Sequence, residues 1–324
     1  MDAEPVWITE SEVVELVDLA MATGAVRSAL ALEHEGRAQT MEKTSLVFGD
    51  GDTLHALGGE VGGPGLVGVK TWAHTGGGAT PLLVLWDSAS GALRAVVEAF
   101  ALGQLRTAAI AAVATDHLAA PHADALALIG TGKQAFAQAA AVASVRTLAT
   151  VSVFSPMPEH RAAMVDRLRA AGAAAQVLDS ASVEEAVAVA SIITTVTRAR
   201  TPFLGVGMLA KGAHVNAMGA ISPERAELAG DLGATAALVV SDSPDTARRL
   251  SRELDGAPEI VSLAAVVAGR TRPDGLSVFK SMGIGLADVA IGSAMLTRAA
   301  AVGAGRPFPH PERVAPHLFG GGRR

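Results

Sequence analysis

A short glycine turn carries the clearest chemical signal in the sequence. The apolar run 125–129 leads into Gly130-Thr131-Gly132-Lys133-Gln134-Ala135, a G-x-G-x-x-A pattern, and then into an alanine-rich helix expected over 133–146. In such a turn the first glycine allows a sharp bend, the second lets the backbone approach a pyrophosphate, and the small last residue lets helix and strand pack closely. Amides at the helix start would bind the anion. The pattern predicts a dinucleotide site, and the alternative is a tight strand–helix turn without a ligand.

Arg106 and Thr107 lie at the start of a helix expected over residues 104–119. A cation is disfavoured at the positive end of a helix unless it meets an anion there. Arg106 is therefore a candidate to hold a carboxylate through two hydrogen bonds. Thr107 could add a hydroxyl to a phosphate at the same helix end. The alternative interpretation of Arg106 is a solvated surface arginine.

Two lysines are further candidates. Lys70 ends the apolar run 66–70, where burial would lower the pKa of its ammonium into a range useful for proton transfer. The alternative is a lysine that protects an edge strand from aggregation. Lys43, in Met41-Glu42-Lys43-Thr44, is interpreted from the pattern alone as a solvated side chain.

The end of the next expected strand, 150–154, bears on the choice of cofactor. An NAD site usually places an acid there for the ribose 2′-hydroxyl, but this sequence has Ser155, followed a few residues later by Arg161. A serine removes the repulsion of a 2′-phosphate, and an arginine could bind one. The pair favours NADP(H) over NAD(H).

The composition excludes several classes of protein. The 324 residues include no cysteine and no tyrosine, aromatic residues make up 3%, and the net charge is −6. Disulfides and thiolate ligands are thus excluded, and nucleic-acid binding through stacking or a basic stripe is not expected. The nine histidines and the carboxylates show no metal-ligand spacing. No apolar run has the length of a membrane span and no signal peptide is recognised, so we expect a cytoplasmic protein.

The order of expected elements predicts an α/β fold. Short apolar runs separated by glycine and aspartate turns fill residues 37–100 and predict a mostly antiparallel sheet, with a hairpin turn at 87–91. After Pro121, strands alternate with helices, which predicts a doubly wound parallel sheet of Rossmann type. Single helices are expected over 9–32, 223–229 and 285–301. The tail, 305–324, is rich in proline and glycine and is expected to lie on the surface or fray.

Five motifs occur in an order that resembles the ornithine cyclodeaminase/mu-crystallin family. They are Gly-Val-Lys (68–70), Leu-Arg-Thr-Ala-Ala (105–109), Gly-Thr-Gly-Lys-Gln-Ala (130–135), Val-Asn-Ala-Met-Gly-Ala (215–220) and Ser-Val-Phe-Lys-Ser-Met-Gly (277–283), followed by Asp288. The resemblance implies a homodimer. It also implies an α+β substrate-binding and dimerisation domain, residues 1–118 and 296–324, into which a dinucleotide-binding Rossmann domain, residues 119–295, is inserted.

The resemblance also assigns residues to roles. Lys70 and Arg106 would hold the substrate carboxylate and frame an imine, and Lys43 falls near a further family arginine and could replace it. The cofactor would be lined by Thr107, Gly130, Thr131, Gly132, Lys133, Gln134, Ser155, Arg161, Thr195, Thr197, Met218 and Lys280, of which Arg161 comes from the argument on the 2′-phosphate rather than from the resemblance.

One departure from the family pattern bears on the reaction. Cyclodeaminases carry an aspartate shortly after the Asn-Ala-x-Gly motif, where this sequence has Ile221. Isoleucine cannot transfer a proton, whereas reduction of a cyclic ketimine needs hydride, a carboxylate clamp and a protonated imine. The resemblance is therefore closest to the ketimine (pyrroline-2-carboxylate) reductase branch. The alternatives are an ornithine or lysine cyclodeaminase, an alanine-type or opine-type dehydrogenase, and a non-catalytic NADP(H)-binding protein like a crystallin.

Overall fold

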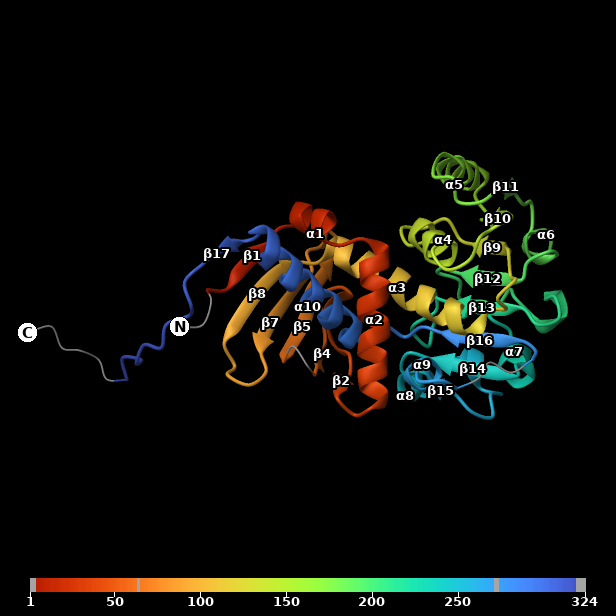
Figure 1. The fold of residues 1–324 in the computed structure, drawn as a ribbon. Coiled ribbons are helices and arrows are strands. Elements are labelled where there is room, and N and C mark those ends of the chain that lie inside the picture. Colours follow the sequence, from red (N-terminus) through yellow and green to blue (C-terminus); the bar gives the residue numbers. More distant parts are fainter. Residues whose placement is uncertain (1–3, 63–64, 271–273, 319–324) are drawn as a thin grey trace, which may run out of the picture.

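Two β-sheets and the helices around them make up the structure, a computed structural model that describes residues 4–62, 65–270 and 274–318 (Figure 1). The first sheet has the strand order β17-β1-β8-β7-β5-β4-β2, with β3 added to β4 and β6 to β5. Its strands are β1 (Val6–Ile8), β2 (Ala38–Thr40), β3 (Thr44–Phe48), β4 (Asp52–Val61), β5 (Leu66–Thr75), β6 (Gly78–Ala79), β7 (Leu82–Asp87), β8 (Leu93–Glu98) and β17 (Arg306–Pro307).

The first sheet is antiparallel at every pair except β1 and β8, which confirms the expectation for residues 37–100. The turn between β7 and β8 is also confirmed. Asp87 caps it, because its carboxylate accepts hydrogen bonds from the amides of Ala89 and Ser90. Aspartate favours such turns because its side chain can bond to backbone amides two or three residues further on.

The second sheet is parallel throughout, in the order β11-β10-β9-β12-β13-β16-β14-β15. This confirms the doubly wound sheet. Its strands are β9 (Ala125–Ile129), β10 (Thr150–Phe154), β11 (Gln176–Asp179), β12 (Ile192–Thr195), β13 (His214–Ala217), β14 (Leu238–Ser241), β15 (Val261–Ser262) and β16 (Ser277–Lys280). The intervening helices are α4 (Ala135–Ala143), α5 (Pro158–Ala170), α6 (Val183–Val187), α7 (Gly230–Thr235), α8 (Pro244–Leu250) and α9 (Leu263–Val267), with 3₁₀ turns at Val206–Met208 and Arg252–Leu254.

Two helix predictions were wrong. The single helix expected over 9–32 is divided into α1 (Glu10–Leu16) and α2 (Leu19–His34). Asp18 forms the break, because its carboxylate accepts a hydrogen bond from the amide of Met21 and so begins a new helix. The helix expected over 223–229 is absent. Residues there run irregularly to Gly230, where α7 begins, and the backbone amides of Glu227 and Leu228 bond to the carboxylate of Glu253 instead of to helix carbonyls.

The helix that carries Arg106 begins earlier than expected. It is α3 (Phe100–Leu118), and it extends from the first sheet to the second (Figure 1). Its first amides, those of Phe100 and Ala101, donate to the carboxylate of Glu10. Glu10 thus takes the place of the anion predicted at this helix end, and Arg106 lies in the second turn of the helix, outside the reach of the terminal dipole. The argument from helix position was wrong for both Arg106 and Thr107.

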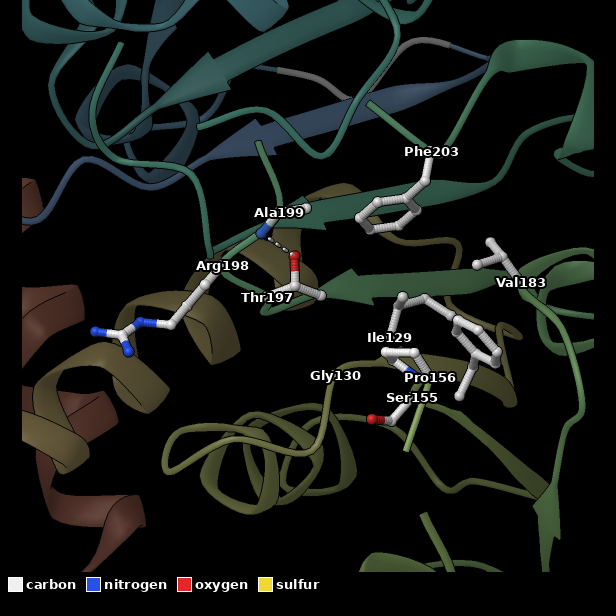
Figure 2. Close-up of a pocket in the computed structure, with 10 residues that line it drawn as sticks. Ile129, Gly130, Ser155, Pro156, Val183, Thr197, Arg198, Ala199 and Phe203 are labelled. Atoms are coloured by element: carbon white, nitrogen blue, oxygen red, sulfur yellow. Dashed lines mark hydrogen bonds between the residues drawn. The ribbon is translucent and has the colours of Figure 1, made fainter. Parts of the chain in front are cut away.

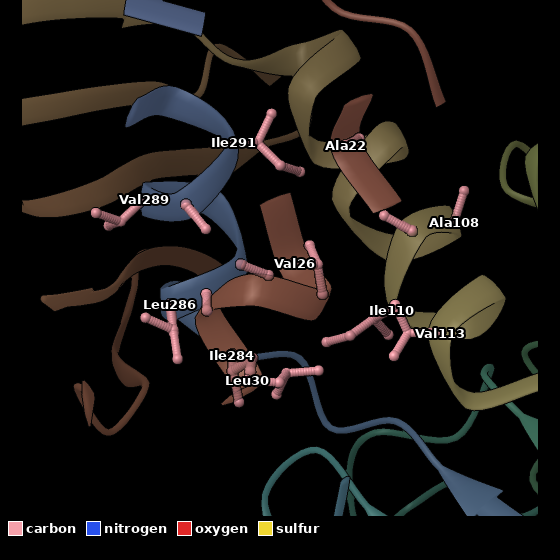
Figure 3. Packing of buried hydrophobic residues seen from close by; sticks show 14 of the residues in the cluster. Ala22, Val26, Leu30, Ala108, Ile110, Val113, Ile284, Leu286, Val289 and Ile291 are labelled. Carbon is pink, nitrogen blue, oxygen red and sulfur yellow. The ribbon is translucent and has the colours of Figure 1, made fainter. Parts of the chain in front are cut away.

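Helix α10 (Gly285–Val302) packs against β4, β5 and β7 of the first sheet and against α2 and α3. In Figure 3, Ile291 of α10 points toward buried side chains of α2 and α3, whereas Val289 points away from these helices; both side chains belong to the same buried apolar cluster. Burial of these side chains stabilises the fold by about 1.5–3 kcal/mol for each one fully removed from water. The helix is long and apolar enough to span a membrane by composition, but 61% of that stretch is buried inside the fold, as in a core helix.

The packing of α10 bears on the expected domain boundaries. All of this helix lies with the first sheet, although the expected boundary at 295 would divide it. We propose instead that the inserted domain ends near residue 284. The tail pairs with β1 through Arg306 and Pro307, and residues 311–318 are exposed. The end of the tail, 319–324, lies outside the described residues.

Replacement of Gly285 by alanine tests how closely α10 approaches the first sheet. A Cβ atom on Gly285 would lie 2.2 Å from the backbone nitrogen of Gly58 in β4, so helix and strand would have to separate. We expect Gly285→Ala to lower the free energy of unfolding by about 1–3 kcal/mol, measured by urea denaturation. Gly24→Ala is the control, because nothing lies within 4 Å of a Cβ there, and alanine in this helix should raise stability by up to about 1 kcal/mol. Equal effects of the two substitutions would contradict the close approach.

Candidate active site

A buried carboxylate joins the two candidate substrate residues. Asp288 lies in the first turn of α10, where the helix dipole favours a negative charge, and it is completely buried. Its Oδ1 accepts a hydrogen bond from Nζ of Lys70, which comes from β5, and its Oδ2 lies 3.8 Å from Nε of Arg106, which comes from α3. Three elements distant in sequence thus meet at one charge. The structure brings together Lys70 and Arg106, as the resemblance implies.

The environment of Lys70 changes its protonation. Only 4% of the residue is exposed, and burial lowers the pKa of its ammonium to about 8, against the opposing charge of Asp288. The charge of Arg106 contributes to this lowering of the pKa. The Nζ atom also lies 5.6 Å from the ring centroid of Trp72, within reach of a cation–π interaction. Lys70 is therefore a buried lysine in the interior of the sheet, and the edge-strand interpretation was wrong. We call the group of Lys70, Arg106 and Asp288 the clamp.

Arg106 rests on the turn that follows β16. A Cβ atom on Gly283 would lie 2.9 Å from Nη1 of Arg106 and 3.6 Å from Cζ, so the guanidinium lies against the bare Cα of this glycine. No residue that the structure describes forms a hydrogen bond with the guanidinium. Its donors thus remain available for a ligand with a carboxylate, the group whose geometry matches a guanidinium best.

A cavity of about 230 Å³ lies beside the clamp, and we call it the clamp cavity. Lys70, Trp72 and Arg106 line it from the first sheet and α3, and Lys133 and Gln134 line it from the glycine turn. The side-chain Oε1 of Gln134 is buried and has no hydrogen-bond partner among the described residues. The glycine turn and the carboxylate clamp therefore face one cavity between the two sheets, as an enzyme that brings cofactor and substrate together requires.

A larger cavity of about 410 Å³ is lined by Gly283, and we call it the Lys43 cavity. Lys43, His55 and Ile221 all line it. The Nζ atom of Lys43 is 5.9 Å from the ring centroid of Trp72, so Lys43 and Lys70 approach the same indole. Burial and the charge of Arg106 lower the pKa of Lys43. The sequence pattern alone placed Lys43 in solvent, and the residue is exposed, but it also lines a cavity next to the clamp.

A third cavity, about 340 Å³ in volume, lies at the carboxyl ends of β9, β10 and β12 (Figure 2). The strand order reverses between β9 and β12, and ligands of open α/β sheets bind at such a switch point. In Figure 2, Ile129, Val183 and Phe203 gather around an apolar space, while the side chain of Arg198 points away from them. An apolar slot at this place fits the flat adenine ring of a dinucleotide.

The glycine turn has the geometry that a pyrophosphate needs. Gly130 has φ +119°, and a Cβ there would lie 2.7 Å from the carbonyl oxygen of Val196, so only glycine fits. Nothing lies within 4 Å of a Cβ on Gly132, which leaves the backbone open to a ligand. No side chain caps the start of α4. The residues present therefore fit a dinucleotide phosphate at this turn.

Ser155 and Arg161 lie together at the end of β10. Nη1 of Arg161 donates to the carbonyl oxygen of Ser155 at 3.0 Å, which brings the guanidinium back to the strand end despite its later place in the sequence. Its Nε also donates to the carboxylate of Asp179. The two residues are thus placed where the 2′-position of the adenosine ribose is expected, but part of the arginine charge is neutralised.

Three of the expected cofactor residues are buried within the protein. Lys280 is fully buried and pairs with Glu253, and Thr195 is fully buried and donates to Glu227. Met218 is 7% exposed and belongs to the core. Protein encloses both Lys280 and Thr195 in this structure, and their contact with a cofactor stays a prediction. Their partners hold the surrounding loops: Glu227 also accepts hydrogen bonds from the amides of Thr197 and Gly219.

The other expected contacts stay predictions. Thr107 is half-buried, and its hydroxyl donates to the carbonyl of Gly103 in its own helix at 2.9 Å. Thr131 is half-buried, and Thr197 lines the cavity drawn in Figure 2. Among the described residues, no group of three histidine, aspartate or glutamate side chains is arranged to hold a metal ion.

Sequence reasoning missed several residues of the site. Asp288 was noted only as following a motif, and Trp72, Asp242, Glu227 and Glu253 were not considered. A signal existed for Asp288, since an acid is rare inside a helix as apolar as 285–301. No local signal marks Trp72 or Glu227, because their roles depend on side chains from other elements.

Fold and site together fit a dinucleotide-dependent enzyme. The comparisons with known proteins agree. A model of the ornithine cyclodeaminase/mu-crystallin family matches residues 3–302. The chain belongs to this family.

Individual relatives carry several activities. A Delta(1)-pyrroline-2-carboxylate reductase of Bacillus cereus is 32% identical over 238 residues, 69% of this chain and 72% of the relative. An ornithine cyclodeaminase of Brucella suis is 35% identical over 214 residues, 63% of this chain and 59% of the relative. The structure of an archaeal alanine dehydrogenase dimer with bound NAD has a TM-score of 0.86 and 25% identity, covering 94% of this chain and 99% of that one. The protein is an NAD(P)-dependent oxidoreductase that acts on carbon–nitrogen bonds.

The pKa of Lys70 predicts how binding of a small ring carboxylate depends on pH. Below pH about 8 the ammonium is charged and attracts the ligand, and above this pH the free protein loses that charge. We expect the dissociation constant of pyrrole-2-carboxylate, measured by calorimetry, to bend upward above pH about 8. Lys70→Met should bind more weakly and lack the bend, whereas Lys43→Met should retain it. A bend that persists unchanged in Lys70→Met would assign the titration to another group.

Proposed function

We propose that the protein reduces cyclic imino acids with NAD(P)H, converting Δ1-pyrroline-2-carboxylate to proline or Δ1-piperideine-2-carboxylate to pipecolate. The observation that carries the proposal is the place of Ile221. It lines the Lys43 cavity beside the turn that supports Arg106. An isoleucine thus lies at the edge of the substrate site, at the position where the family resemblance puts the aspartate of the cyclodeaminases.

The clamp performs the binding step of this reaction. The guanidinium of Arg106 binds the substrate carboxylate in a bidentate manner, and the ammonium of Lys70 adds a second positive charge from β5. Lys43, which forms no hydrogen bond with any described residue, lies near the same Trp72 ring and adds a further positive charge. Asp288 keeps Lys70 and Arg106 close to each other although their charges repel, and the fixed clamp places the imine carbon for attack.

The chemistry at the imine needs one hydride and one proton. The nicotinamide cofactor supplies the hydride when bound. The ring nitrogen of a cyclic ketimine is basic, so it arrives protonated or takes a proton from water or from Lys70, whose pKa of about 8 suits proton transfer near neutral pH. No side chain at position 221 is required to carry a proton. Deamination, in contrast, requires a group that handles the substrate amine or the attacking water.

The polar lining of the Lys43 cavity favours a second candidate. Its volume of about 410 Å³ exceeds the need of a five-membered ring, and Ser222, Ser243 and Asp245 line it. An open-chain substrate would fill this space, as in a cyclodeaminase or an amino-acid dehydrogenase of the same family. Release of ammonia from ornithine or lysine with catalytic NAD would support this candidate. Nucleotide binding without turnover on any imine would support a third, a crystallin-like binding protein.

We also propose a preference for NADP(H), a homodimer and a cytoplasmic location. Ser155 and Arg161 at the end of β10 support the cofactor preference. The dimer is supported by β3, an edge strand whose residues are all exposed, including Leu46, Val47 and Phe48. Such an apolar edge is a template for pairing with another chain.

The reductase proposal predicts that both cyclic imines oxidise NADPH, measured as the loss of nicotinamide absorbance. We expect a lower kcat/KM with NADH than with NADPH. Arg106→Ala should remove about 3–5 kcal/mol of transition-state stabilisation, because it truncates one partner of a desolvated charge pair. A loss below about tenfold would mean that Arg106 is not the clamp. No oxidation with either ring size would overturn the proposed reaction.

The cofactor preference predicts the effect of an acid at the end of β10. A carboxylate at position 155 would bind the ribose 2′-hydroxyl of NADH and repel the 2′-phosphate of NADPH. We expect Ser155→Asp to lower kcat/KM with NADPH by about tenfold or more, while the value with NADH changes much less. Ser152→Ala in the same strand is the control. Equal loss with both cofactors would place Ser155 outside the 2′-position.

A further inference from the structure

A second buried carboxylate lies behind the turn that supports Arg106. Asp242 directly follows β14 and is 5% exposed. Its Oδ1 accepts a hydrogen bond from the amide of Met282 at 2.7 Å, and its Oδ2 accepts from the amide of Gly283 and from the hydroxyl of Ser281, each at 3.0 Å. Three consecutive residues of one turn thus donate to a single side chain. A carboxylate with this many donors is held in a fixed position.

The turn that Asp242 holds is the support of Arg106. It connects β16 to α10, and its last residue, Gly283, has φ +83° and lies against the guanidinium. Asp288, the ion-pair partner of Arg106, follows five residues later in the first turn of α10. A shift of the turn would therefore displace both the surface beneath Arg106 and the start of the helix that carries its carboxylate partner.

The charge of Asp242 also belongs to the surroundings of the clamp. Burial raises the pKa of Asp242, whereas the donors of the turn and the positive charge of Arg106 lower it. On the other side of the carboxylate, Glu33 of α2 lines a shared cavity of about 350 Å³. Burial and the negative charge of Asp242 raise the pKa of Glu33 to about 7. Asp242 thus lies between the clamp and a second acid, Glu33. The positive charge of Arg106 in the clamp favours the ionised form of Asp242.

We propose that Asp242 is a positioning residue of the reaction: through residues 281–283 it fixes the orientation in which Arg106 binds the substrate carboxylate. This inference rests on the proposed function for the identity of the substrate, but it requires only that Arg106 binds a carboxylate. Asp242 lies behind the turn and acts through Arg106, so its removal should weaken carboxylate binding more than nucleotide binding.

The test compares four variants by steady-state kinetics and calorimetry. In Asp242→Asn, one oxygen is replaced by an NH2 group, which donates and cannot accept, so either Met282 or both Ser281 and Gly283 lose their acceptor. We expect KM for the cyclic imine and the dissociation constant of pyrrole-2-carboxylate to rise about tenfold or more, while the dissociation constant of NADPH changes less than about threefold. Gly283→Ala should have the same pattern, because its Cβ would displace the guanidinium directly.

Two further variants separate positioning from stability. Leu168→Ala removes a buried side chain of α5 in the core beside the second sheet, far from the clamp in the chain. It should lower the melting temperature and leave KM unchanged. Ser281→Ala removes one donor, and it keeps the proposal testable if Asp242→Asn fails to fold. We expect a smaller rise in the same two constants, about threefold.

The outcomes distinguish this proposal from the proposed function. Melting temperatures that fall in Asp242→Asn and Ser281→Ala with unchanged KM and unchanged carboxylate affinity would overturn the positioning role. A wild-type protein that binds pyrrole-2-carboxylate but reduces no imine would count against the proposed reaction. The calorimetric comparison would then still decide the role of Asp242, because it does not depend on turnover.

Discussion

The buried carboxylate of Asp288 is the constraint on which the site depends. Lys70 and Arg106 carry like charges and come from a strand and a helix that are separated in the chain. Without an anion between them, their repulsion and the cost of burying Lys70 would separate them or remove a proton. Asp288 makes this arrangement stable in the free protein. The group of Lys70, Arg106 and Asp288 keeps one excess positive charge, which an entering carboxylate can neutralise.

The meeting of Lys70, Arg106 and Asp288 depends on the two connections between the sheets, helix α3 and residues 281–284. Helix α3 starts beside the first sheet and ends against β13 of the second, so it fixes Arg106 between them. The chain returns from the second sheet to the first through residues 281–284 and enters α10 at once. The clamp is therefore assembled at the crossing of both connections, where the glycine turn of the nucleotide site can also reach it.

Buried carboxylates recur around the loops that line the site. Asp242 holds residues 281–283, and Glu227 holds Thr197 and Gly219. Glu253 bonds to the backbone of residues 227–228 and to Lys280. Each of these acids is enclosed by protein and accepts several donors from segments without regular structure. Loops cannot satisfy their amides by helix or sheet ladders, so a fixed carboxylate supplies the missing acceptors and makes the loops rigid.

The sequence by itself determined the parallel sheet and the glycine turn, and it singled out Lys70 and Arg106, which the structure brings together at Asp288. These follow from local periodicity, from the geometry of G-x-G-x-x-A and from five ordered motifs. Local patterns also predicted the antiparallel character of the first sheet. They misplaced the start of α3 and predicted a helix at 223–229 that is absent, because Glu10 and Glu253, which are distant in the chain, accept hydrogen bonds from the backbone amides there.

Only the tertiary structure decided which charges are paired, which side chains are enclosed and which face a cavity. Lys43 borders a cavity because β3 and α8 converge there, and Asp288 is central because α10 packs on the first sheet. The physical reason is that the energy of a charge depends on the groups and the amount of water around it, and these are set by contacts between residues far apart in the chain.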